Sequence, residues 1–111
     1  MKQILHVCAF GSQRPGNFIE SLMQLQNRMQ DIGYETIYAF TEDAKDRSWC
    51  KDIQKTNRVY FLPVARARIL PKTYLLIKQI YNENDIDIVH SHFELYDIPV
   101  TIMAPKKVKV F

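Results

Sequence analysis

The sequence predicts an α/β fold: a three-layer, Rossmann-like, doubly wound parallel sheet of about five strands. Short runs rich in β-branched and aromatic residues alternate with segments of helical periodicity, as in folds built from βαβ units. The runs at 3–9 and 86–90 are nearly continuous in apolar residues, as strands buried on both faces are. Right-handed crossovers then favour the strand order 3-2-1-4-5.

Length and composition indicate one ordinary globular domain, with 111 residues, 47% hydrophobic and 24% charged. No apolar stretch approaches the roughly 18 residues of a membrane-spanning helix. The N-terminus runs into a Gly/Pro loop without a cleavage site, so we expect a cytoplasmic protein with reduced cysteines. The net charge of +3 is mild and no nucleic-acid-binding module is recognisable, so we expect no nucleic-acid partner.

The first helix follows a loop at 10–17 that holds two glycines and a proline. Asn17 is a candidate N-cap for this helix, with Glu20 as its capping-box partner. Gly33 fits the left-handed position just after the helix. The apolar face is expected to consist of Phe18, Leu22, Leu25 and Met29, joined by Ile19 and Met23.

The later elements follow from the same patterns. We expect strands at 34–40, 58–62, 86–90 and 107–111, helices over 71–84 and over 98–104, and a short helix or irregular segment from Trp49. Because the chain stops in or just after an apolar strand, we expect a fragment of a longer protein. Apolar surface left uncovered in such a fragment could also support a homodimer.

Gly11 and Gly16 lie between the first strand and the first helix. A glycine loop before a helix N-terminus is a candidate anion site, because free backbone N–H groups and the helix dipole point outward. The spacing Gly11-x4-Gly16 matches neither G-x-G-x-x-G nor a P-loop, so NAD binding and P-loop chemistry are not expected. Two interpretations stay open: a tight turn, or a loop that faces a phosphate.

His90 and His92 lie at the end of the fourth strand run, on one face of an extended chain. Zinc needs three or four ligands and neither cysteine is near in sequence, so we expect no metal site. We expect His90 to pack against the sheet with a hydrogen bond. His92 lies farther out, where it could bind a sugar or phosphate or move a proton. Glu94 could orient His92 or could be a solvated carboxylate.

Arg66, Arg68 and Lys72 follow the third strand run. Parallel strands place their carboxyl ends at one edge, so this basic segment could meet an anionic acceptor or a lipid head group there. The latter would make the protein peripheral at the inner face of the membrane. The other interpretation is a solvated surface.

Together these residues resemble the N-terminal, acceptor-side domain of a GT-B glycosyltransferase of the retaining family 4 type. The resemblance rests on Ile4-Leu5-His6-Val7, the Pro15-Gly16 turn and Gly33-Tyr34-Glu35. Its most specific part is Asp87-Ile88-Val89-His90-Ser91-His92-Phe93, similar to the family segment D-[IV]-[VIL]-H-x-H. It covers essentially the whole chain, with Pro15-Gly16 where the family often carries two adjacent glycines.

The resemblance implies a sugar transfer from a nucleotide-sugar donor to a polysaccharide, lipid-linked or small-molecule acceptor, with retention and without cofactor or bound metal. It implies that Gly16 approaches the donor diphosphate or the acceptor, and that His92 lies near the reacting sugar. The donor pocket and the family's paired glutamates would belong to a C-terminal domain outside these residues, so we expect this chain to be inactive alone.

The main alternative is a stand-alone flavodoxin-like or receiver-like binding or interaction domain without catalysis. A receiver would need acidic residues after the first strand and an aspartate after the third, and Cys8-Ala9-Phe10 and Leu62-Pro63 supply neither. A flavodoxin would need a Ser/Thr-rich phosphate loop, where this chain has Ser12 alone. An interaction domain that pairs through a sheet edge stays open.

Overall fold

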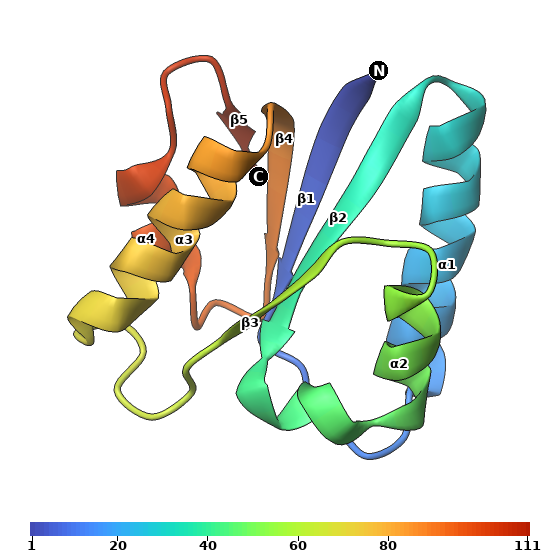
Figure 1. Ribbon diagram of the computed structural model, residues 1–111, viewed down its shortest axis with the longest axis horizontal. Helices are drawn as coiled ribbons and strands as arrows, with labels where there is room; N and C mark the ends of the chain where they lie inside the picture. The colour runs from blue at the N-terminus through green and yellow to red at the C-terminus, as the bar shows by residue number, and fades with distance from the viewer.

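The computed structural model describes residues 1–111 and confirms the predicted fold class. One five-stranded, all-parallel sheet has the order β3-β2-β1-β4-β5, with helices on both faces (Figure 1). The strands are β1 (Lys2–Cys8), β2 (Tyr34–Thr41), β3 (Val59–Leu62), β4 (Ile86–His92) and β5 (Lys109–Val110). The helices are α1 (Gly16–Asp31), α2 (Ser48–Gln54), α3 (Pro71–Glu83) and α4 (Asp97–Met103), with a 3₁₀ helix, η1 (Glu42–Asp46).

Two apolar cores lie on opposite faces of the sheet. Successive side chains of β1 alternate between them, as a pleated strand requires: Leu5 and Val7 join the core under α3 and α4, and Cys8 joins the core under α1 and α2. Figure 1 shows the two helix pairs on either side of the strands. The α1/α2 core takes residues from β1, β2 and β3 but none from β4. β4 is therefore less deeply covered on that face.

The start of α1 differs from the prediction. The helix begins at Gly16 after Pro15, and no side chain caps it, so the predicted capping box of Asn17 and Glu20 is wrong. Gly16 has φ +57° and turns the chain directly into the helix, which places Asn17 inside the first turn rather than at the cap. The end of α1 confirms the prediction, since Gly33 has φ +91° and its N–H donates to the Gln30 carbonyl.

The other predicted elements lie close to their expected ranges, whereas η1 was not predicted. β4 extends two residues beyond the predicted end, to His92, whereas β5 is shorter than predicted. Both cysteines are buried and unpaired. None of the helices combines the length and the apolar character that a membrane crossing requires.

A buried hydrogen bond ties the β4–α4 connection to the end of β3. The Tyr96 hydroxyl is fully buried and donates to the Pro63 carbonyl at 2.6 Å. Because β3 and β4 are separated by two other strands in the sheet, this contact spans the carboxyl edge. It holds the segment that follows His92 against the loop that carries the arginines.

We predict that Tyr96→Phe lowers the free energy of unfolding by about 1–3 kcal/mol, since it leaves a buried carbonyl without its donor. The matched control is Tyr74→Phe, because the Tyr74 hydroxyl also donates to a backbone carbonyl at 2.6 Å, but at an exposed site. Urea unfolding of both variants checks the prediction. Equal losses in the two variants would contradict it.

Candidate functional site

The candidate site lies at the carboxyl ends of β1 and β4. From β1 the sheet grows to β2 and β3 on one side and to β4 and β5 on the other, so the direction of winding reverses between β1 and β4. In open α/β sheets such a reversal leaves a crevice beyond the strand ends, and ligands bind there. The position of the site therefore follows from the strand order.

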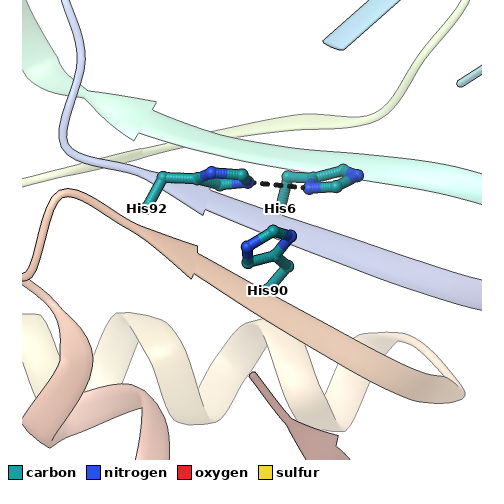
Figure 2. A group of neighbouring side chains, drawn as sticks. All are labelled: His6, His90 and His92. Carbon is teal, nitrogen blue, oxygen red and sulfur yellow. Dashed lines mark hydrogen bonds between the residues drawn. The ribbon is translucent and has the colours of Figure 1, made fainter. Parts of the chain in front are cut away.

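All three histidines of the chain meet at this point. His6 comes from β1, and His90 and His92 come from β4 (Figure 2). The strand register pairs His6 with His90 and Cys8 with His92, which places the three rings on one face of the sheet. One ring nitrogen from each histidine lies within 4.8 Å of the other two. His6 was not among the site residues predicted from the sequence.

His6 and His92 share a hydrogen bond. His6 Nδ1 and His92 Nε2 are 3.0 Å apart, as the dashed line in Figure 2 marks. Burial, followed by the neighbouring His92 and His90, lowers the pKa of His6 to about 3. Burial and His90 lower the pKa of His92 to about 4. Both rings are therefore neutral at pH 7, and one of the two facing nitrogens donates its hydrogen to the other.

His90 differs from its prediction. It is half-buried as expected of a packed residue, but no hydrogen bond holds its ring. Its ring lies against His92, with the centroids 3.9 Å apart. The expected hydrogen bond belongs to His92 instead, because His92 lies diagonally across from His6 and reaches its Nδ1.

An aromatic wall borders His92. The Phe18 ring, in the first turn of α1, meets the His92 ring edge-on at 5.3 Å. Phe93 packs edge-on against Phe18 at 4.7 Å and is 55% exposed. Phe10, from the β1–α1 loop, lies 4.9 Å from Phe18 and 5.5 Å from Trp49. The site therefore combines a neutral imidazole with apolar ring faces, one of them open to solvent.

The two loop glycines have different surroundings. A Cβ on Gly11 would overlap the side chains of Thr41 and Asp43, and Arg47 Nε donates to the Gly11 carbonyl at 3.0 Å. Gly11 therefore permits close packing against η1, whereas the left-handed backbone that favours glycine in a turn occurs at Gly16. Gly16 is exposed, with open space where a side chain would project. That a phosphate faces either glycine stays a prediction.

Glu94 and the arginines are exposed at the same edge. Phe93 and Glu94 both have left-handed backbone, with φ +67° and +58°, so the chain turns sharply after His92. Arg66 is also left-handed, with φ +54°, and together with Arg68 it lies in the loop after β3. No ion pair involves either guanidinium, and Glu94 forms neither an ion pair nor a hydrogen bond with His92. The roles predicted for these three side chains stay predictions.

The largest surface groove lies beside the histidines rather than on them. It has a volume of about 390 Å³ between α1 and α2, and Gly16 and Trp49 line it together with both apolar residues, such as Ile19, and polar ones, such as Asp52. His92 does not line it. Gly16 therefore connects two features of the edge, since it borders the groove and lies two residues before Phe18, which contacts His92.

We predict that, with a chelator present, the chain loses stability as the pH falls from about 6.5 to 5. The folded pKa values of about 3 for His6 and about 4 for His92 lie below the ordinary value of 6.5, so in this range only the unfolded chain binds the extra protons. This stabilisation is complete above about pH 6.5 and is lost as the pH falls toward the folded values.

Urea unfolding midpoints at pH 7, 6 and 5 measure this loss. In His92→Gln one of the two groups is removed, so its midpoint should fall less steeply over the same range. A midpoint of the original chain that is unchanged from pH 7 to 5 would contradict the prediction.

Comparison with known proteins yields a structural likeness only. No protein-family model and no curated sequence matches the chain. Among solved structures, the crystal structure of Acinetobacter baumannii MurG, a GT-B glycosyltransferase, superposes on 94% of this chain with a TM-score of 0.65 and 13% sequence identity. The chain spans 32% of the length of that structure. The likeness is one of fold: both proteins contain a Rossmann-like α/β domain.

Proposed function

We propose that this chain is the acceptor-side N-terminal domain of a retaining, two-domain glycosyltransferase. The parent enzyme transfers a sugar from a nucleotide sugar to a polysaccharide, lipid-linked or small-molecule acceptor. The observation that carries the proposal is the position of His92, at the carboxyl end of β4 and beside the winding reversal of a GT-B-like sheet. No cofactor takes part in the proposed reaction.

In the proposed role, His92 binds a hydroxyl or a developing oxygen charge of the reacting sugar. Its Nε2 is engaged by His6, which leaves Nδ1 for the substrate. When Nδ1 donates to a substrate oxygen, Nε2 must accept from His6 Nδ1, because a neutral imidazole carries one hydrogen. His6 thereby positions His92 and selects its tautomer, as a hydrogen-bonded partner does for a functional histidine.

The surroundings of His92 support a sugar as ligand. A sugar ring presents hydroxyls at its rim and C–H groups on its faces, so it suits a polar group beside apolar ring faces such as the exposed Phe93. The open space at Gly16 would admit the donor diphosphate or the acceptor. A second domain would supply most of the donor contacts.

The test uses the full-length product of the gene, purified and incubated with a panel of nucleotide sugars and acceptors. We predict that His92→Ala lowers kcat by about 10²-fold or more, the scale of a lost positioned acid–base group. Lys78→Ala, on the exposed face of α3, is the control and should retain full activity. A kcat of His92→Ala within about twofold of that of the original protein would show that His92 takes no part in the reaction.

Absence of turnover with every donor would contradict the proposed function. A stand-alone binding domain would then be the better interpretation of the chain. Product stereochemistry, read by NMR of the new anomeric centre, tests retention separately.

Arg66 and Arg68 are proposed to bind an anionic acceptor, or the head group of a lipid that carries it. We predict that Arg66→Ala/Arg68→Ala raises KM for an anionic acceptor several-fold and weakens its salt dependence, with kcat unchanged, since the lost contacts act on binding. The control is the double variant Lys51→Ala/Lys2→Ala, which also removes two positive charges but leaves Arg66 and Arg68 in place. An unchanged KM in the arginine variant would mean that these side chains are solvated surface.

A further inference from the structure

We propose that His6, His90 and His92 form a binding site for a borderline divalent transition-metal ion, of which Zn²⁺ is the most common in proteins. This inference concerns an activity that the proposed sugar transfer does not need. It rests on the convergence of the three rings, with one nitrogen of each within 4.8 Å of the others (Figure 2).

The strand geometry suits a three-histidine set. His90 and His92 are two residues apart on β4, so they share a face, and His6 faces them from the neighbouring strand in register with His90. Two nitrogens bound to one tetrahedral zinc lie about 3.3 Å apart, given bonds of about 2.0–2.1 Å. His6 Nδ1 and His92 Nε2 are already 3.0 Å apart. Rotation about χ2, a soft torsion in histidine, would bring the His90 nitrogen inward.

The three histidines differ in burial, and this difference suits a metal site. His6 is fully buried, so strands β1 and β2 hold its ring in place, whereas His90 and His92 are half-buried. An ion can therefore enter from the side of β4, where no residue joins the α1/α2 core. The same open side leaves a fourth position for water, as in zinc sites with three protein ligands.

The ligand chemistry of the cluster also favours this inference. Neutral imidazoles without carboxylates select zinc, cobalt, nickel or copper over magnesium, calcium or manganese.

Binding needs no other reactant. The ion takes the place of the hydrogen between His6 Nδ1 and His92 Nε2, and that hydrogen moves to the outer nitrogen of the same ring. The rings of His6 and His92 stay neutral, and the ion keeps its charge. Nδ1 of His92 is not consumed as a ligand.

The test is isothermal titration of the chelator-treated, dialysed chain with ZnCl₂ and, separately, with MgCl₂. We expect one zinc ion per chain with a micromolar or lower dissociation constant, and no magnesium binding. His90→Asn changes a proposed ligand at the more exposed end of the cluster. It should weaken zinc binding at least about tenfold, because substitution even of residues that only support metal ligands lowers metal affinity by about that factor or more. Cys8→Ala removes the thiol in register with His92 and should bind zinc as the original does.

A second readout does not depend on any variant. Because the chain has no other histidine, the imidazole NMR signals report on this cluster alone, and all three rings should shift together on addition of one equivalent of zinc. Absence of zinc binding up to about 100 μM, equal binding by His90→Asn, or unshifted imidazole signals would each overturn the proposal. No sugar substrate enters these measurements, so their outcome is independent of the test of sugar transfer.

Discussion

The parallel pairing of β1 with β4 is the constraint on which the rest of the structure depends. These strands lie far apart in the sequence, and their register brings His6 to His90 and Cys8 to His92. A slip of one residue would move every side chain of one strand to the opposite face and separate the three rings. The apolar alternation of β1, with Leu5 and Val7 fixed in the α3/α4 core, prevents that slip. The hydrophobic cores therefore set the geometry of the polar site.

The free-energy cost of burying a charged ring explains the state of the histidine pair. His6 is fully buried, and a charged ring there would lose its hydration without an acidic partner to compensate. His6 and His92 instead stay neutral and meet part of their hydrogen-bonding need through each other. Since the hydrogen position in one ring fixes the hydrogen position in the other, the protein core influences what His92 presents to solvent. The proposed sugar site uses this coupling, whereas the proposed metal ion would take the place of the shared hydrogen.

The likeness to MurG concerns the scaffold, and the scaffold leaves the function open, because one fold can carry many different sites. What is particular to this chain lies at the strand ends: the three histidines, the aromatic wall of Phe10, Phe18 and Phe93, and the left-handed turn after His92. Rigid strands hold the histidines, whereas loops hold Arg66 and Glu94. The former are thus preorganised, and the latter can adapt to an acceptor.

The sequence by itself determined the elements and their order, because apolar periodicity, Gly33 and Pro71 act over a few neighbouring residues. It also placed His90 and His92 on one face, since alternation along a strand is a local property. The start of α1 could not be predicted from the sequence, because the helix begins at Gly16, which has left-handed backbone, and Asn17 is not its N-cap. Only the tertiary structure added His6 to the cluster and packed Gly11 against η1. Both arrangements depend on which strands are neighbours and in what register they pair. The simultaneous burial of two cores decides that pairing, and no single stretch of sequence contains both cores.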